Sequence, residues 1–358
     1  MIIKTKKLLN TLYNNIFVFS ALFFLSLGIA VYLLTGRSTV NMLSEQMLHR
    51  EQIIVRSGAG TIQNFLSLFG NTLSFSAQNN SISLNNLNES EKILTQLVNS
   101  SRNTPISGFA LINKDGQPVL NLNDLGRGQV NGLSFSDRDY YLWSKTAKPR
   151  EIFVGKPVVS RLGASSGKMI IPIASPIIRK GEYEGVLTAA VILSDLTDSF
   201  LNPLRISDNS EAYLIKNDGE IIYADRFSEA VGKNVFSYLG DNSFLGSKYI
   251  KTEVQKVLAD NKEGKMKAVY PKFGNSEGFS ERLVAYAPID LKDGQLWYLA
   301  VSTPIEDALV FMGPFYSRQI LLTIFIFIAI LIYAVRFSKL QGFKEGHDLY
   351  HQEKNSSK

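Results

Sequence analysis

The run SDRDYYLWSKTA at Ser136–Ala147 holds the side chains best suited to bind a small anion. The guanidinium group of Arg138 presents a planar fork of donors that can meet a carboxylate with two hydrogen bonds. Tyr140 and Tyr141 add hydroxyl donors and flat apolar faces, and Trp143 lies on the same helical face as Tyr140. The same residues would also fit a salt bridge and a hydrophobic core, so both roles stay open.

Catalytic chemistry has little support in the sequence. The three histidines are His49, His347 and His351, and none lies in the folded region expected at 102–306. His-based acid–base or zinc chemistry therefore has no residues to work with there. The chain has no cysteine, and Gly58-Ala59-Gly60 fits tight packing better than a phosphate-binding loop. We expect no enzyme activity, no metal and no cofactor.

Two apolar runs lie near the ends of the chain. Ile16–Leu34 and Ile320–Val335 each approach the roughly 20 apolar residues that cross a bilayer as a helix. They predict transmembrane helices at 16–35 and 319–335. A cleaved signal peptide is the alternative for the first run, but its apolar core is long and no small-x-small cleavage site follows it.

Basic residues flank both apolar runs and set the expected orientation. They are Lys4, Lys6 and Lys7 before the first run, and Arg336, Lys339 and Lys344 after the second. Because short basic flanks stay in the cytoplasm, we expect 1–15 and 336–358 inside a bacterial inner membrane and the segment between the runs outside it, in the periplasm or extracellular space. Of the formal net charge of +6, a net charge of +5 lies at these two ends, so the basic balance does not indicate a nucleic-acid partner.

The region before the first proline predicts helices. All 11 prolines lie at or beyond Pro105, which favours a long stalk helix and a following helix within 36–101, the second at Asn88–Ser101. An apolar face with four-three spacing runs along the stalk: Leu43, Met47, Ile54, Ile62, Phe65, Phe69 and Leu73. This face can pack on its own domain or form the seam of a homodimer, and the sequence allows both.

Beyond Pro105 the pattern changes to strands, and it occurs twice. Phe109–Asn121 and Tyr213–Ala224 each place an Asp-Gly turn between two apolar runs, which predicts a β-hairpin. Ile171–Ile177 and Leu283–Ile289 form a second matching pair, each followed by another apolar strand. These echoes predict two tandem α+β modules of antiparallel strands.

The two modules are expected at 102–200 and 207–306. Together with the stalk helix and the flanking spans, they resemble the double Cache (tandem PAS-like) sensors of bacterial receptors. The residues that carry the resemblance are Asp137-Arg138-Asp139-Tyr140-Tyr141, Gly155-Lys156-Pro157-Val158, Ile171–Ile177 and Gly185-Val186-Leu187. The resemblance implies an extracytoplasmic ligand pocket in the first, membrane-distal module, the second module being membrane-proximal. It also implies that Lys156 and Ser175 lie on strands that line this pocket.

The resemblance also bears on the ligand. In amino-acid-sensing members of the family, an Arg-x-Trp-Tyr run binds the ligand carboxylate, an earlier tyrosine assists, and an aspartate on a later strand holds the amine. Arg138-Asp139-Tyr140-Tyr141 matches that run, with Tyr140 in place of the tryptophan. The earlier tyrosine position falls near Leu133, and the aspartate position falls at or near Ala190. The resemblance therefore implies a carboxylate ligand without an ammonium group, or an uncharged ligand.

Receptors of this type usually continue into a signalling module such as a kinase, a methyl-accepting coiled coil or a diguanylate cyclase. Only residues 336–358 follow the second apolar run, so we expect signalling through a partner or an output domain that is separate from this chain. The overall prediction is a membrane-anchored, homodimeric small-molecule sensor of the kind used in chemotaxis or two-component signalling. A co-receptor whose modules bind a protein partner and a membrane-anchored hydrolase using carboxylates are the alternatives.

Overall fold

A computed structural model describes residues 2–225, 228–237, 247–271, 279–291, 295–310, 313–314, 317–330, 332–333 and 335–336. The chain divides into two compact units, one of residues 46–307 and one of residues 1–45 with 308–358. The candidate site lies wholly in the first unit. Residues 337–358 of the predicted tail, with His347 and His351, lie outside the described residues.

The predicted membrane spans fall in the second unit. Among the residues that the structure describes, no helix has a stretch both long enough and apolar enough to cross a bilayer. The spans at 16–35 and 319–335 therefore stay predictions.

Helices form the N-terminal part of the chain, as the absence of proline before Pro105 predicted. Helix α1 runs from Ile2 to Gln78, and α2 spans Leu87–Ser100. Asn86 is the N-cap of α2, because its side chain accepts a hydrogen bond from the main-chain nitrogen of Glu89 at 3.4 Å.

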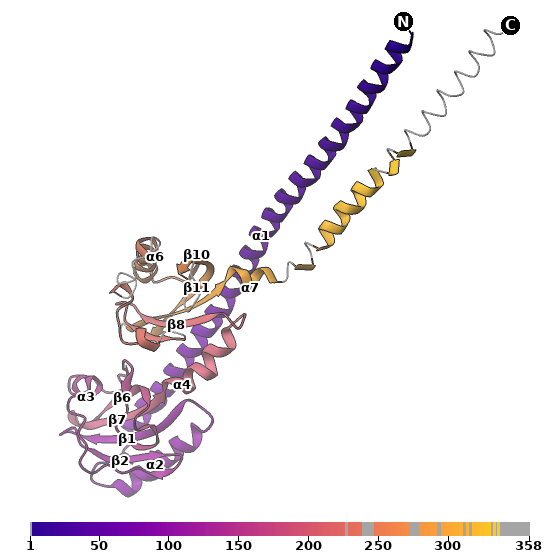
Figure 1. The fold of residues 1–358 in the computed structure, drawn as a ribbon. Coiled ribbons are helices and arrows are strands. Elements are labelled where there is room, and N and C mark those ends of the chain that lie inside the picture. The colour runs from indigo at the N-terminus through magenta and orange to yellow at the C-terminus, as the bar shows by residue number, and fades with distance from the viewer. Residues whose placement is uncertain are drawn as a thin grey trace, which may run out of the picture. The chain divides into compact units, whose positions relative to one another are not determined.

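The first sheet has seven strands in the order β3-β2-β1-β7-β6-β4, with β5 paired to β6. Figure 1 labels its neighbouring strands β2, β1, β7 and β6. All their pairings are antiparallel. The strands are β1 (Ile106–Asn113), β2 (Pro118–Asn123), β3 (Gly126–Arg127), β4 (Phe153–Val154), β5 (Val158–Val159), β6 (Met169–Arg179) and β7 (Glu182–Ile192). Two short elements interrupt the connection from β3 to β6, namely α3 (Asp139–Ser144) and the 3-10 turn η1 (Gly163–Ser165).

The second sheet has five strands in the order β10-β11-β12-β8-β9. Its strands are β8 (Glu211–Lys216), β9 (Ile221–Ala224), β10 (Gly264–Pro271), β11 (Phe279–Leu291) and β12 (Gln295–Pro304). Further helical elements of the chain are α4 (Leu193–Leu196), η2 (Thr197–Leu201), η3 (Asn202–Leu204), η4 (Ser228–Ala230), α6 (Ser247–Asp260) and α7 (Ile305–Leu309).

The two sheets share one topology, which explains the sequence repeat. Neighbouring strands run β2-β1-β7-β6 in the first sheet and β9-β8-β12-β11 in the second. In both, the first hairpin turns at an Asp-Gly pair whose glycine, Gly116 or Gly219, has a positive φ. The α+β class, the long N-terminal helix and the antiparallel sheets are thus confirmed.

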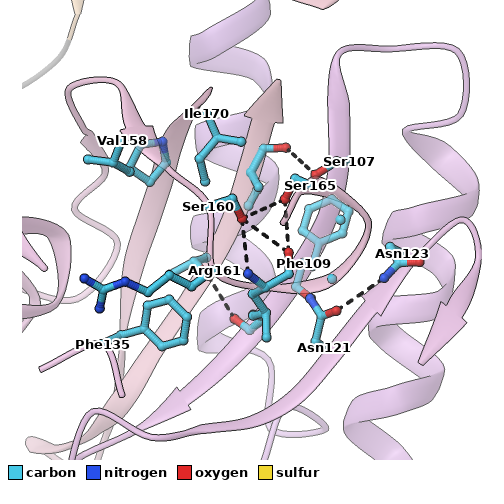
Figure 2. Close-up of a pocket in the computed structure, with 18 of the residues that line it drawn as sticks. Ser107, Phe109, Asn121, Asn123, Phe135, Val158, Ser160, Arg161, Ser165 and Ile170 are labelled. Atoms are coloured by element: carbon cyan, nitrogen blue, oxygen red, sulfur yellow. Dashed lines mark hydrogen bonds between the residues drawn. The ribbon is translucent and has the colours of Figure 1, made fainter. Parts of the chain in front are cut away.

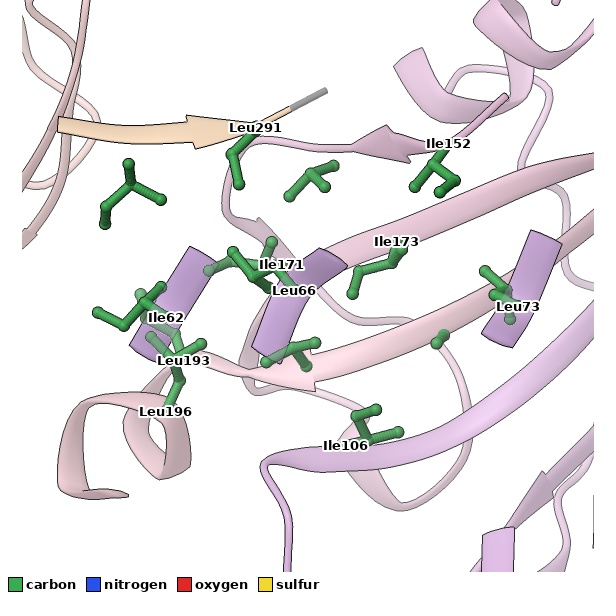
Figure 3. Packing of buried hydrophobic residues seen from close by; sticks show 14 of the residues in the cluster. Ile62, Leu66, Leu73, Ile106, Ile152, Ile171, Ile173, Leu193, Leu196 and Leu291 are labelled. Atoms are coloured by element: carbon green, nitrogen blue, oxygen red, sulfur yellow. The ribbon is translucent and has the colours of Figure 1, made fainter. Parts of the chain in front are cut away.

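The C-terminal half of α1 packs against both sheets. Its buried side chains include Val55, Ala59, Ile62, Leu66 and Leu73, and all belong to one apolar cluster. Figure 3 shows Ile62 and Leu66 of α1 close to side chains of β6 and β11. Burying one such side chain contributes roughly 1.5–3 kcal/mol. Along this stretch, the apolar face packs on its own domain.

Candidate ligand-binding site

A partly open pocket lies over the first sheet, between its strands β1, β2, β6 and β7 and the segment that carries β5 and η1. It holds about 540 Å³ of empty space, open solvent included, and is called the cavity below. Figure 2 shows Ser160, Arg161 and Ser165 of that segment together with Asn121 of β2. Arg138 and Tyr140, which the sequence analysis singled out, both line this cavity.

Arg138 is the N-cap residue of α3, with an extended backbone at φ −82° and ψ 137°. Its Nη2 donates a hydrogen bond to the main-chain oxygen of Val159 at 2.9 Å. Its Nε is buried and has no hydrogen-bond partner among the described residues. A buried donor without an acceptor costs about 1–3 kcal/mol, so an acceptor oxygen placed beside Nε would remove this cost.

Tyr140 is the second predicted residue in the cavity wall, and it is only 5% exposed. Burial raises the pKa of its phenol above the ordinary value, and the positive charge of Arg138 opposes that shift. The hydroxyl group therefore stays neutral at physiological pH and keeps its proton for donation to a ligand.

Arg161 also lines the cavity, but its charge is already balanced. Its Nη2 lies 3.0 Å from Asp137 Oδ2 in an exposed ion pair, and this pair lowers the pKa of Asp137. Arg138 forms no such ion pair with any described carboxylate. It is therefore the cation better placed to bind an anion in this cavity.

The rest of the cavity wall is neutral. The buried amide of Asn121 donates to the main-chain oxygen of Phe109 at 3.1 Å, and Asn123 donates to Asn121 Oδ1 at 3.3 Å. Thr188 donates to Ala110 across the sheet at 3.3 Å. Among the described residues, the lining includes no aspartate and no glutamate.

Asn121 and Asn123 were not among the residues predicted to bind a ligand, although the run VLNLN held a signal for them. Asparagine is depleted in β-strands, and two residues spaced i, i+2 in a strand point to the same face. Both side chains are buried in β2. Two buried amides on one face of a strand need partners and can also bind a polar ligand.

Four other predicted ligand-binding residues lie outside this cavity. The hydroxyl group of Tyr141 donates to the main-chain oxygen of Lys114 at 2.6 Å, and Trp143 packs on the ring of Phe153 with centroids 5.2 Å apart. The fully buried Ser175 donates to the main-chain oxygen of Glu151 at 2.9 Å.

Lys156, the fourth of these residues, borders a separate, partly open hollow with about 750 Å³ of empty space, open solvent included. The side chains that also border it include Lys216 and Trp297 of the second sheet. The cavity over the first sheet therefore brings together Arg138 and Tyr140 alone among the predicted residues.

The two positions that the resemblance assigned to an amino-acid ligand carry no polar side chain. Ala190 of β7 lines the cavity and pairs with Gly108 of β1. Leu133 is partly buried and packs against the apolar cluster that contains Tyr140. Neither residue can bind an ammonium group.

A sequence profile described as Cache domain matches residues 39–310. This match covers most of the chain, so the protein belongs to the Cache domain family. The resemblance to the double Cache sensors is thereby confirmed.

Solved structures with the same fold include ligand-binding domains of chemoreceptors. That of Pseudomonas fluorescens CtaA in complex with L-isoleucine is 18% identical, with a TM-score of 0.53 over 76% of this chain and 98% of the other. That of Pseudomonas aeruginosa PAO1 PctB in complex with L-Arg is also 18% identical, with a TM-score of 0.55 over 76% of this chain and 93% of the other. A search of curated protein sequences gives no match.

Proposed function

We propose that this chain is the input part of a sensor that binds a small carboxylate in the cavity over its first sheet. The observation that carries the proposal is the buried Nε of Arg138, which lacks a hydrogen-bond partner among the described residues. Apart from Arg161, which is paired with Asp137, the other groups that line the cavity are neutral. A carboxylate would accept from the guanidinium fork, and such charge-assisted bonds are about twice as strong as neutral ones. Tyr140 would donate a further hydrogen bond.

The lining supports a carboxylate without an ammonium group. The chemoreceptor domains compared above hold L-isoleucine and L-Arg, and both ligands carry an ammonium group that needs an acceptor. In this chain Ala190 lines the cavity where the resemblance implies an aspartate. An unpaired ammonium group in this wall would lose its water without gaining a charged partner.

The signalling route that we propose follows from the ends of the chain. The apolar runs at 16–35 and 319–335 anchor the protein in a bacterial membrane, with the cavity outside and the termini inside. The first module is the distal one, and two copies of the chain associate as a homodimer. Ligand binding shifts one span against the other, and a signalling partner or output domain reads the shift.

Binding, rather than catalysis, accounts for the groups in the cavity. The lining combines two arginines with neutral hydroxyl and amide groups. Among the described residues it contains no histidine or carboxylate that could move a proton. The alternative of a hydrolase would need paired acids in one cleft.

Thermal unfolding of the full-length chain with a panel of organic acids, amino acids, amines and purines tests the proposal. Ligand at about 100 times its Kd adds roughly 2.7 kcal/mol to the stability of the native state. We expect shifts with carboxylates that lack an α-amino group and none with the matching amino acids. Shifts confined to amines or purines, or none across the panel, would contradict the proposal.

A further inference from the structure

Glu51 of α1 is a carboxyl group with no exposed surface, and it lies in the compact unit of residues 46–307. Its Oε1 is 2.6 Å from the hydroxyl oxygen of Thr303, close to the end of β12. Its Oε2 is buried and has no hydrogen-bond partner among the described residues. Removing a carboxylate from water in this way is costly, so the surroundings favour the protonated form.

No described cation is paired with Glu51 exclusively. Arg282 of β11 is the cation whose charge acts on Glu51, but its Nη2 already lies 3.3 Å from Glu211 of β8. Burial is therefore the dominant effect and raises the pKa of Glu51 to about 8, against smaller effects of Thr303 and Arg282. The other ionisable side chains close in sequence to Glu51 on α1 and to Thr303 on α7 are His49, Arg50, Glu306 and Asp307.

A chain of hydrogen bonds connects Glu51 with Asp307 of α7. From Thr303 the series continues to the hydroxyl oxygen of Ser210, 2.8 Å from that of Thr303. The hydroxyl oxygen of Ser207 follows, 3.1 Å from that of Ser210. Ser207 lies 2.6 Å from Asp307 Oδ2. This series has four oxygen–oxygen contacts, but its three hydroxyl groups supply only three protons. If the carboxylates at both ends are ionised, one of the four contacts therefore has no hydrogen.

A proton on Glu51 completes this chain. Each group can then donate to the next, from Glu51 to Thr303 and onward to Asp307, which is only partly buried. When Glu51 loses its proton, the chain loses one hydrogen bond, and a buried charge remains on α1. Both effects weaken the contact between α1 and the junction of β12 with α7.

We propose that Glu51 is a proton switch, which is protonated while α1 is packed on the end of the second sheet and which weakens that contact when it ionises. External pH is then a second input to the protein. The switch is built from α1, β12, α7 and the segment with Ser207 and Ser210 just before β8, and it does not use the cavity over the first sheet. It therefore stands whether or not that cavity binds a carboxylate.

Infrared difference spectroscopy on the full-length chain reads the protonation state directly. The comparison is between the wild type and Glu51→Gln, whose amide keeps the size of the side chain and can donate to Thr303. At pH 6 we expect the wild type to show the C=O band of a protonated buried carboxyl that Glu51→Gln lacks, and we expect this band to disappear as the pH rises past 8. Absence of the band at pH 6 would overturn the proposal.

Spin labels can report the movement, because the chain has no native cysteine. Cysteines introduced at the exposed positions His49 of α1 and Glu281 of β11 carry the labels. We expect the distance distribution to be broader at pH 9 than at pH 6 in the wild-type background and unchanged in the Glu51→Gln background. A wild-type distribution that does not depend on pH would refute the switch.

Ser210→Ala separates the hydrogen-bond chain from burial alone. Without the Ser210 hydroxyl group, Thr303 no longer has to donate to Ser210 and is free to donate to an ionised Glu51. We therefore expect the pH at which the infrared band disappears to fall by about one unit. Ser280→Ala is the matched control, because its hydroxyl group donates to Glu306 outside the chain. Equal transition pH values in the two variants would show that the chain has no role.

Discussion

Arg179 at the end of β6 donates from Nη2 to the main-chain oxygen of Ala77 at the end of α1, over 2.9 Å. The same nitrogen lies within 2.6 Å of the oxygen of Asn79 and 3.0 Å of the oxygen of Ile82. The last carbonyl groups of a helix have no partners inside the helix and carry a partial negative charge. Arg179 therefore satisfies the end of α1 and attaches it to the first sheet.

Replacing Arg179 should destabilise the compact unit. Arg179→Ala leaves these main-chain oxygens without their charged donor, and we expect a loss of about 2–4 kcal/mol in the free energy of unfolding. Arg127→Ala is the matched control, because Arg127 is half exposed in a surface ion pair with Glu91, and such pairs contribute about 0–1 kcal/mol. Urea denaturation of the full-length chain measures both, and equal losses would contradict this role for Arg179.

The long helix could be predicted from the sequence, but its buried face only in part. The four-three pattern of large apolar residues correctly included Ile62 and Leu73. The pattern could not show that Gly58 and the acidic Glu51 also lie on the buried face of α1. A Cβ atom at Gly58 would meet the side chains of Leu204 and Leu299, so α1 approaches closely there because the residue is small.

The candidate site shows the same limit. The run at residues 138–141 was informative because it combines a cation with aromatic residues, yet successive residues of a helix point in different directions. Tyr140 thus lines the cavity, while Tyr141 donates to Lys114 on the other side. The Asn121 amide comes from a distant strand, and only the pairing of β1 with β2 brings it to the cavity.

Arg138→Ala should reduce the affinity for the carboxylate that the thermal-shift panel identifies. Because the substitution leaves the ligand charge unpaired in a partly closed cavity, we expect a loss of about 2–5 kcal/mol in binding free energy. Arg161→Ala removes a cation from the same wall, but one that is already paired with Asp137, so it should change affinity much less. Isothermal titration calorimetry compares the two, and equal losses would contradict the assignment of Arg138.

Gly163→Ala should disturb the cavity, whereas Gly167→Ala should not. Both glycines have a positive φ, so each alanine carries a similar backbone cost of about 1–2 kcal/mol. A Cβ atom at Gly163 would lie 2.5 Å from Asn121 Oδ1 and displace that amide, whereas one at Gly167 meets no atom within 4 Å. We expect similar thermal destabilisation from this backbone cost but a loss of ligand affinity only for Gly163→Ala, and calorimetric titration of both variants checks this.

The stability of the protein should fall as the pH rises from about 4.5 to 8, because of Glu51. In the folded chain the pKa of this carboxyl is raised from 4.5 to about 8 by burial, so between these values the folded state holds a proton that the unfolded state has lost. Its contribution is fully present below pH 4.5 and is lost by pH 8. At 1.36 kcal/mol per pKa unit, the loss is at most about 5 kcal/mol.

Glu51→Gln isolates this contribution from that of other titrating groups. The variant cannot ionise at residue 51, so its free energy of unfolding should depend less on pH than that of the wild type, and the difference should open between pH 5 and pH 8. Urea denaturation at pH steps from 5 to 9, with wild type and variant side by side, measures this difference. Parallel pH profiles would mean that Glu51 is ionised in the folded chain already at pH 5, whereas a gap that widens up to pH 8 and then stays constant would show that packing α1 on the second sheet binds a proton.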